Sequence, residues 1–362
     1  MPTLLITSMG GTGSRSLLET IRQFDHAGEY TVIGTHCFPL ELVKADLEYG
    51  YLVPKAVETD EYMRAHLEII KRHAVDLFIA NSDKEVAVVS PHRQSLPCAH
   101  LIPDNELVAA VQDKYQLHAV LKKHGCAVVE NVPVESRGNL AKAAARLEPG
   151  RFWVRSRGGS GSMGATWVDN ASQAAKWIDL WCELRGLEYD DFVLAPFLPG
   201  RDFCVAVMFQ DGEFCIGKAY ERLSYIVGDI TLSGMGSSPA NARTVGEKLP
   251  VDTAIQAVRA VYAEYGATPH GYYQLDLKCD QNGAPYVTEI NIGRFPMTNP
   301  HFDRVGEHVL LKHYVSLALE PENRLPRGVY DLVSGGYILR SIDFPIVFTS
   351  EAEVAGLTKW DD

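Results

Sequence analysis

An Asn-Gly pair, Asn282-Gly283, lies between two apolar segments in YYQLDLKCDQNGAPYVTEIN, and it constrains the fold more than any other feature of the chain. Asn-Gly is a preferred pair for the tight turn of a β-hairpin. Asp276 precedes Asn282 by six positions and Glu289 follows Gly283 by six positions, so folding at this pair sets the two acids opposite each other. The sequence therefore predicts an antiparallel strand pair with two facing carboxylates.

A third oxygen-bearing side chain follows on the second strand of this predicted pair. Asn291 lies two positions after Glu289, and alternate residues of a strand point to the same face. Mg²⁺ prefers oxygen ligands and commonly binds through one or two carboxylates together with substrate phosphates. Solvated acids at a loop are the plainer interpretation, but both acids have apolar neighbours, and buried carboxylates are rarely left unpaired. Asp276, Glu289 and Asn291 thus indicate a metal site that works with a nucleotide.

A glycine-rich segment, FWVRSRGGSGSMGA, forms a second candidate site. Arg155 ends an apolar strand, and a run of small residues follows: Gly158, Gly159, Ser160, Gly161, Ser162 and Gly164. Glycine allows the backbone to approach a ligand closely and to aim successive N–H groups at phosphate oxygens. A flexible hairpin tip is the alternative, and Arg155 favours the phosphate site. The spacing is not that of a P-loop, because no Gly-Lys-Ser/Thr opens a helix.

The N-terminal segment SMGGTGSRSLLETI has the pattern of a strand, a glycine turn and a helix. Gly11 and Gly13 resemble the start of a dinucleotide fingerprint, but Ser16 occupies the third glycine position. The second strand ends in TVIGTHC, without the acid that would bind a ribose, so an NAD-linked oxidoreductase is disfavoured. We expect the turn to hold an anionic substrate group at the helix N-terminus, with simple helix packing as the alternative. The residues concerned are Gly11, Thr12, Gly13 and Ser14.

Length and composition narrow the class of protein. A chain of 362 residues normally contains two or three packed units. The formal charge of −12 argues against a nucleic-acid partner, and no apolar run is long enough to span a membrane. The first residues lack the basic flank of a signal peptide, so we expect a cytoplasmic location. Seven scattered cysteines without a CxxC pair argue against a disulfide framework and a zinc site.

The order of the expected elements divides the chain. Strands and helices alternate over about the first hundred residues, which predicts a doubly wound parallel sheet. The segment SLPCAHLIPDNE interrupts this alternation with two prolines. After Asp191 the pattern changes to antiparallel hairpins, which turn at Asp211-Gly212 and at Asn282-Gly283. The predicted fold is thus multidomain, first α/β and then α+β with antiparallel sheets.

In this order, Arg155, the Gly/Ser loop and the Asp/Glu/Asn set resemble the ATP-grasp superfamily. The resemblance is closer to carboxylate–amine ligases related to the large subunit of carbamoyl phosphate synthase. It extends over about residues 1–320 and includes Asp113-Lys114, the hinge strand FLPGRDF and the EIN signature. It implies four parts: a Rossmann-like pre-ATP-grasp domain (1–108), a lid subdomain (109–192), a C-terminal ATP-grasp subdomain with the metal site (193–325) and an extension of unknown role (326–362).

The resemblance also implies roles for single residues. Lys114 and Arg155 would contact the ATP phosphates, and Arg294 would contact the transferring phosphoryl group. The segment from Gly158 to Gly164 would be a mobile phosphate loop. The remaining nucleotide contacts would be Ala195, Pro196 and Phe197 for adenine and Asp202 for the ribose. The chain departs from many relatives in having no Glu in this hinge and in inserting Gly293 before Arg294.

The implied activity is the ATP-dependent joining of a small-molecule carboxylate to an amine, with Mg²⁺ or Mn²⁺ as cofactor. The carboxylate would be activated as an acyl phosphate, and we expect it to lie between the turn at Gly10–Ser14 and Arg294. Two alternatives stay open: phosphorylation of a carboxylate or carbamate without an amine, and a non-catalytic ATP-binding sensor. A homodimer is a candidate assembly.

Overall fold

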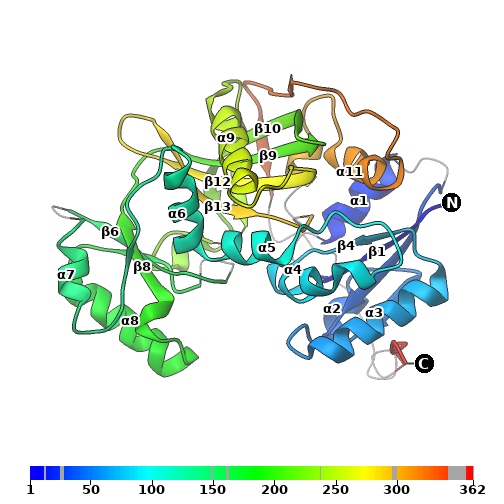
Figure 1. Cartoon of the computed structure of the whole chain (residues 1–362), viewed down its shortest axis with the longest axis horizontal. Coiled ribbons are helices and arrows are strands. Elements are labelled where there is room, and N and C mark those ends of the chain that lie inside the picture. Colours follow the sequence, from blue (N-terminus) through cyan, green and yellow to red (C-terminus); the bar gives the residue numbers. More distant parts are fainter. Residues whose placement is uncertain are drawn as a thin grey trace.

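The computed structural model describes residues 1–11, 14–24, 28–147, 150–159, 163–236, 238–295, 300–340 and 356–361. The strands of these residues form three sheets, and no strand belongs to more than one of them. Figure 1 shows the small antiparallel sheet on the left, the large sheet behind α9 in the middle and the parallel sheet on the right. Within the described ranges, no helix is both long enough and apolar enough to cross a bilayer.

The N-terminal part forms the predicted parallel sheet, in the order β3-β2-β1-β4. Leu4 and Ile6 on β1 pack with residues of α1, whereas Leu5 packs with residues of α3, because alternate side chains of a strand reach opposite faces. The two helices therefore cover the two faces of the sheet, as a doubly wound fold requires. The elements are β1 (Thr3–Ile6), α1 (Ser14–Phe24), β2 (Thr31–His36), α2 (Pro39–Val43), β3 (Tyr49–Leu52), α3 (Thr59–His73), β4 (Leu77–Ile79), α4 (Asp83–Val89) and the 3₁₀ helix η1 (Ser90–Ser95).

Two helices, α5 (Asn105–Gln112) and α6 (Lys114–Lys123), connect this part to a small antiparallel sheet in the order β5-β8-β6-β7. The small sheet has its own apolar core, which includes residues of α7 and α8. The predicted boundary at residue 193 falls inside β8, which pairs with β5 and β6 and so belongs to the small sheet. The elements are β5 (Val132–Pro133), α7 (Leu140–Ala144), β6 (Phe152–Ser156), β7 (Thr166–Val168), α8 (Ala171–Arg185), η2 (Tyr189–Asp191) and β8 (Phe192–Pro196).

The large sheet has the order β13-β12-β9-β10-β11-β15, and β14 pairs with β10. Both predicted hairpins form, because β9 ends at Gln210 and β10 begins at Glu213, while β12 and β13 flank the Asn282-Gly283 turn. Helix α9 packs on one face, which leaves the opposite face for the candidate site. The elements are β9 (Asp202–Gln210), β10 (Glu213–Tyr225), η3 (Gly228–Ile230), β11 (Pro239–Thr244), α9 (Leu249–Glu264), β12 (Gly271–Cys279), β13 (Pro285–Asn291), α10 (Pro300–Asp303), α11 (Leu310–Leu319), β14 (Val329–Tyr330) and β15 (Tyr337–Leu339).

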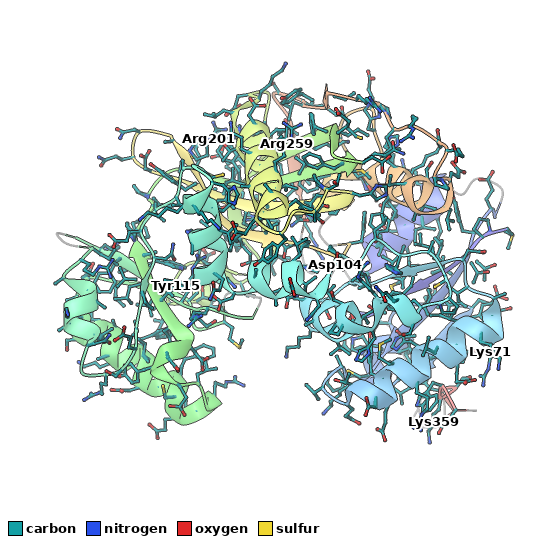
Figure 2. The ribbon with its side chains drawn as sticks, viewed as in Figure 1. Lys71, Asp104, Tyr115, Arg201, Arg259 and Lys359 are labelled. Atoms are coloured by element: carbon teal, nitrogen blue, oxygen red, sulfur yellow. The ribbon has the colours of Figure 1, made fainter. Side chains whose placement is uncertain are left out.

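The C-terminal extension contacts two of the three sheets. Its strand β15 lies beside β11 at the edge of the large sheet. Further along the chain, Lys359 forms a bridge with Leu52 of β3, and the Trp360 ring packs under the guanidinium of Arg64. Figure 2 shows Lys359 at the lower right, on the side of the molecule that carries α3 and Lys71. The extension thus reaches from the large sheet to the parallel sheet.

Candidate active site

One face of the large sheet forms the floor of the candidate site. The strand register places Tyr220, Cys204, Asp276 and Glu289 next to one another on β10, β9, β12 and β13. Residues that are directly opposite in antiparallel strands share a face, and residues two positions apart keep it. A cavity of about 510 Å³ lies over this face, and residues from the small sheet and from the end of β4 complete its walls.

The predicted pairing of Asp276 with Glu289 is confirmed by the register of β12 and β13. A bulge next to this pair leaves Thr288 without a partner in the register, and bulges of this kind re-aim neighbouring side chains. Asn291 lies opposite Gln274, two positions along the strands from the Asp276–Glu289 pair. All three predicted metal ligands line the same cavity.

Each of the three predicted ligands lies against a cationic side chain. Arg222 forms an ion pair with Asp276, and Arg294 donates to Oδ1 of Asn291. Nζ of Lys114 lies 3.6 Å from Oε2 of Glu289. Burial raises the pKa of the Glu289 carboxyl, and the Lys114 ammonium opposes this shift. The site therefore combines concentrated negative charge with cations at its rim.

This donor set fits a hard divalent cation such as Mg²⁺ or Mn²⁺, because it consists of two carboxylates and an amide oxygen. In the part of the chain that the structure describes, no group of three or more His, Cys, Asp and Glu side chains is arranged to bind a metal. A metal here would therefore need further ligands, such as the phosphate oxygens of a nucleotide.

Lys114 is held at the cavity by its neighbours. The carboxylate of Asp113 caps α6 by accepting from the backbone N–H of Tyr115 and Gln116, and it also pairs with Arg157 at 2.6 Å. The Lys114 ammonium donates to the carbonyl of Gly159 at 2.8 Å. The side chain is only 10% exposed, so its charge is directed into the cavity rather than to solvent.

Arg155 is buried at the end of β6 with only part of its hydrogen-bonding capacity used. It donates to the carbonyl of Thr288 at 3.0 Å, and its Nη2 lies 3.3 Å from Nε2 of His118. Its Nε has no partner among the described residues. Burial lowers the pKa of Arg155 to about 10, and burial beside this guanidinium lowers the pKa of His118 to about 3. A neutral His118 therefore supports a buried cation.

Hydrogen bonds to Ser156 hold both sides of the glycine-rich segment where it leaves β6. The Ser156 hydroxyl lies within hydrogen-bonding distance of the carbonyls of Gly158 and Met163, at 2.7 and 3.0 Å. Gly159 and Gly164 have φ values of +85° and +66°, which favour glycine. Gly159 and Met163 line the cavity. The predicted loop residues Ser160, Gly161 and Ser162 lie outside the described residues.

Part of the cavity wall is apolar. Ala195, Pro196 and Phe197 line it at the end of β8, and Trp153 lies opposite Ala195 in the small sheet. A planar base would be matched by such a surface, while the backbone at the strand end offers polar groups. The three hinge residues that the resemblance assigns to adenine thus line the cavity, and their contact with adenine stays a prediction.

Asp202 lines the cavity, but protein donors surround its carboxylate. Arg222 and the Tyr225 hydroxyl donate to it at 3.0 and 2.7 Å, and Lys278 lies 3.8 Å away. The Asp202 carboxylate therefore already accepts hydrogen bonds from protein groups, and a ribose hydroxyl would have to share it with them. Arg222 and Tyr225 could not be recognised from the sequence as site residues, because their place in the cavity depends on the register of β10.

Arg294 contacts the N-terminal part of the molecule. Its Nε donates to Asp83 at 2.7 Å, and the amide of the next residue, Phe295, donates to the carbonyl of Ala80. The inserted Gly293 has φ +68°, and a Cβ there would lie 2.9 Å from side-chain atoms of Pro103 and Val86. The glycine therefore allows the close approach that brings Arg294 to the cavity.

The described residues of the N-terminal glycine turn, Gly10, Gly11 and Ser14, do not line the cavity that contains Arg294, contrary to our expectation. Gly10 packs against α2, where a Cβ would lie 1.6 Å from the carbonyl oxygen of Glu41. Ser14 is buried and accepts from the Gly10 amide at 3.0 Å, and neither Gly11 nor Ser14 lines the cavity. Thr12 and Gly13 lie outside the described residues. The parallel sheet instead presents the segment after β4, which comprises Asn81, Ser82 and Asp83.

Comparison with models of protein families and with curated proteins finds no match to this chain. Solved structures do match it. The L-amino acid ligase from Bacillus licheniformis is 13% identical, with 88% of this chain and 74% of that chain covered and a TM-score of 0.65. For the biotin carboxylase from Campylobacter jejuni, the identity is 16%, the coverage 92% and 74%, and the TM-score 0.69. For the N5-carboxyaminoimidazole synthetase from Staphylococcus aureus, the values are 12%, 90% and 78%, and 0.63.

These similarities extend over nearly the whole chain at low identity, so they concern the arrangement of the sheets and helices. The parallel sheet, the small sheet and the large sheet follow one another in the order that the motifs predict. The chain therefore has the ATP-grasp fold that these three structures share.

Proposed function

We propose that the chain is an ATP-dependent ligase that activates a carboxylate as an acyl phosphate and joins it to an amine. The observation that carries this proposal is the convergence of two sets of side chains on one cavity. Lys114 and Arg155 supply buried positive charge, and Asp276, Glu289 and Asn291 supply oxygen donors. Cations for phosphate oxygens and donors for a divalent metal are what phosphoryl transfer from ATP requires.

Two further features support ATP as the phosphoryl donor. The apolar hinge at Ala195, Pro196 and Phe197 lines the same cavity as the charged groups. Among the similar structures, the biotin carboxylase from Campylobacter jejuni is described as an ATP complex. We propose Lys114 and Arg155 as the phosphate contacts, and Asp276, Glu289 and Asn291 as the ligands of Mg²⁺ or Mn²⁺.

The first proposed step forms a bond between a carboxylate oxygen and the γ-phosphorus and breaks the bond to the bridging oxygen that leaves with ADP. Both reactants are anionic, so Lys114, Arg155 and Arg294 would offset their repulsion. When bound, the metal ion would neutralise charge on the phosphate oxygens. In the second step the amine nitrogen attacks the acyl carbon, phosphate leaves with the electrons of the C–O bond, and the amine loses a proton to solvent.

An acyl phosphate is easily hydrolysed, so water must be excluded from the cavity. The glycine-rich segment begins at the cavity wall, and we propose that it closes over the phosphates. The carbonyl of Gly159 already accepts from Lys114, which couples this segment to a residue proposed to contact phosphate. Nucleotide binding and closure would then occur together.

ADP release from purified protein with ATP and MgCl₂ tests the proposal. Carboxylic acids are supplied singly, each with and without a panel of amines and amino acids. Release that requires both partners supports the ligase, whereas release with an acid alone supports phosphorylation without an amine. ATP binding without release under any condition supports the sensor alternative. Glu289→Gln is the inactive control, because it removes a charged metal donor without removing its bulk.

Three finer assignments remain proposals. The first is the closer kinship to the carbamoyl phosphate synthase large subunit, because none of the three similar structures named above is that protein. A homodimer has a precedent, because one similar structure is described as a biotin carboxylase domain dimer. Light scattering on purified protein would measure the mass in solution.

The four-part domain division stays a prediction, with the first internal boundary at 108 and the second best placed after β8.

A further inference from the structure

The parallel sheet contributes one wall of the cavity, which consists of three residues after β4: Asn81, Ser82 and Asp83. Two hydrogen bonds hold this segment against the chain that follows β13. The Phe295 amide donates to the carbonyl of Ala80 at 2.8 Å, and Nε of Arg294 donates to Asp83 at 2.7 Å. Asn81 lies between these two anchors in the chain. The wall is therefore beside Arg294, where phosphoryl transfer is proposed.

The side-chain amide of Asn81 has an unused oxygen. Its Nδ2 donates to the carbonyl of Thr7 at 3.1 Å, and the backbone amide of Asn81 donates to the Thr7 hydroxyl at 3.2 Å. A carbonyl can only accept, so this contact fixes which end of the amide faces Thr7. The other end, Oδ1, is buried and has no partner among the described residues. A buried acceptor without a donor is costly, and a ligand in the cavity that Asn81 lines would supply one.

The side chains of the other two wall residues are already engaged. The Ser82 hydroxyl donates to Oε2 of Glu85 at 3.0 Å and accepts from the Glu85 backbone amide at 3.3 Å, which caps α4. The Asp83 carboxylate holds Arg294. Asn81 is thus the residue of this wall whose side chain still needs a partner, and that partner must bring a hydrogen-bond donor.

Negative charge beside Asn81 favours a cationic donor. Glu85 is 7% exposed, and its Oε2 accepts from the hydroxyls of Thr7 and Ser8 at 2.5 and 2.9 Å. Burial raises the pKa of Glu85 and hydroxyl groups oppose this shift, with no cation among the described groups that act on it. Thr7 links the two side chains, because it accepts from the Asn81 amide and donates to Glu85. An ammonium group at Asn81 would therefore add positive charge where none balances Glu85.

The reactants of the proposed ligase differ in what they can donate. The ionised carboxylate and the phosphate oxygens only accept hydrogen bonds, whereas the amine carries N–H groups. The adenine amino group and the ribose hydroxyls also donate, but they are assigned to the hinge and to Asp202, which belong to the other two sheets. The amine is therefore the reactant that matches the free oxygen of Asn81.

We propose that Oδ1 of Asn81 accepts a hydrogen bond from a primary amino group, and that the wall after β4 is the binding site of the attacking amine. This inference rests on the proposed ligase function and assigns a place to its second substrate. The same chemistry has another source, because the carboxylate substrate could itself be an amino acid. The experiment below distinguishes the two.

Calorimetry measures amine binding without turnover. The protein is saturated with a non-hydrolysable ATP analogue and Mg²⁺ and titrated with ammonium chloride, methylamine and a panel of amino acids. Each amine is compared with its fully N-methylated counterpart, which keeps the positive charge but has no N–H to donate. Wild-type protein should bind at least one primary amine about tenfold or more tightly than its counterpart, since a hydrogen bond to a charged group is lost. This comparison needs no variant.

Two substitutions separate the acceptor from the contact with Thr7. Asn81→Leu and Asn81→Asp both remove the Nδ2 donor, but aspartate keeps an oxygen acceptor. Asn81→Leu should lose the preference for the primary amine, whereas Asn81→Asp should retain it, and both should keep the affinity for the ATP analogue. Asn323→Leu is the control, because Asn323 is exposed and its amide donates to Ser316 and Glu320. The control should keep the wild-type preference.

The proposal is overturned if wild-type protein binds no primary amine more tightly than its methylated counterpart. It is also overturned if Asn81→Leu keeps the preference. Equal loss in Asn81→Leu and Asn81→Asp would overturn it as well, because the side chain would then act only through Thr7.

Steady-state kinetics show which substrate carries the amino group. With an acid and amine pair that releases ADP, Asn81→Leu should raise the KM for the amine about tenfold and leave the KM values for the acid and ATP near wild type. A rise in the KM for the acid instead would overturn the assignment to the attacking amine. Failure of the proposed function has a different signature, because ADP is then released with no pair, while calorimetry still measures the amine preference.

Discussion

Asp276 and Glu289 lie directly opposite each other on β12 and β13, yet each faces its own cation. Arg222 pairs with Asp276, and the Lys114 ammonium lies 3.6 Å from Glu289. Two adjacent carboxylates repel each other. This repulsion is offset because one acid lies against an arginine of β10 and the other against a lysine of α6. A divalent cation between the acids would take over part of this compensation. The pair is therefore the most informative target for mutation.

Glu289→Gln should leave the fold intact and reduce turnover at least about 100-fold, because it removes a charged donor where transition-state charge is stabilised. Its effect on stability should have the opposite sign. Burial raises the pKa of Glu289, so the stability of the protonated form is present below the unfolded-state pKa and lost as pH rises through the folded-state pKa. Glutamine cannot ionise, and the nucleotide-free variant should melt higher than wild type at pH 8.

Circular dichroism melting and Mg²⁺-dependent ADP release measure the two effects. Glu264→Gln is a matched control, because Glu264 pairs with Lys123 and His124 away from the cavity. Near wild-type turnover of Glu289→Gln would remove Glu289 from the metal site. A lower melting temperature at pH 8 would show that the Lys114 ion pair outweighs the burial of the charge.

Arg294→Met should lower kcat at least about 100-fold, because its guanidinium is proposed to offset charge on the transferring group. Asp83→Asn should have a smaller effect in the same direction, since Asp83 holds Nε of Arg294 at 2.7 Å. Steady-state kinetics of both variants at saturating ATP provide the measurement. If Arg294→Met retained the wild-type kcat, its place in phosphoryl transfer would be wrong.

His118→Ala should raise the KM for ATP about tenfold and change kcat less, because it withdraws a neutral partner from the buried Arg155. His118→Gln, which can still accept from the guanidinium, should recover part of the affinity. Fluorescence titration with a labelled ATP analogue measures the affinity directly. Equal affinities of wild type and His118→Ala would leave His118 without a role in positioning Arg155.

ATP should slow proteolytic cleavage in the segment from Arg157 to Ala165. Two glycines of this segment have positive φ, and the carbonyl of Gly159 accepts from Lys114 at the cavity. Closure on phosphate would then make the backbone less accessible to protease. Limited digestion with subtilisin, followed by mass spectrometry, locates the cuts with and without MgATP. Unchanged cleavage here, with protein that demonstrably binds ATP, would argue against a closing loop.

The protein should lose stability in mild acid because of its buried histidines. Burial lowers the pKa of His66 to about 4. A histidine with a depressed folded-state pKa stays neutral in the fold while the unfolded chain takes up a proton, so stability falls as pH decreases from about 6.5 towards 4. Each such group contributes roughly 1.4 kcal/mol per pH unit over that interval.

Urea denaturation at pH 7.5, 6.0 and 5.0 measures this slope. His66→Gln should lower the slope by about 1.4 kcal/mol per pH unit, whatever its effect at pH 7.5. His92→Gln is the control, because His92 lies on the surface. Identical slopes for wild type and His66→Gln would assign the acid sensitivity to other groups.

Local features of the sequence were sufficient for much of the fold. The Asn282-Gly283 turn and the alternation of apolar residues set the register that brings Asp276 opposite Glu289. The cap at Asp113 likewise begins α6 and places Lys114 at its first turn. In these cases the interacting residues are near one another in the chain, so turn chemistry and side-chain periodicity carry the information.

Other parts of the candidate site depend on contacts between separate sheets. Asp83 pairs with Arg294 across 211 positions of the chain, and the glycine turn at Gly10 packs on α2 instead of entering the cavity. Strand β15 likewise completes the edge of the large sheet only because it pairs with β11, a strand far from it in the chain. The sequence by itself determined the hairpins and the order of motifs. Only the tertiary structure decided which side chains share the cavity, because the docking of one sheet on another is governed by packed surfaces that have no periodic pattern along the chain.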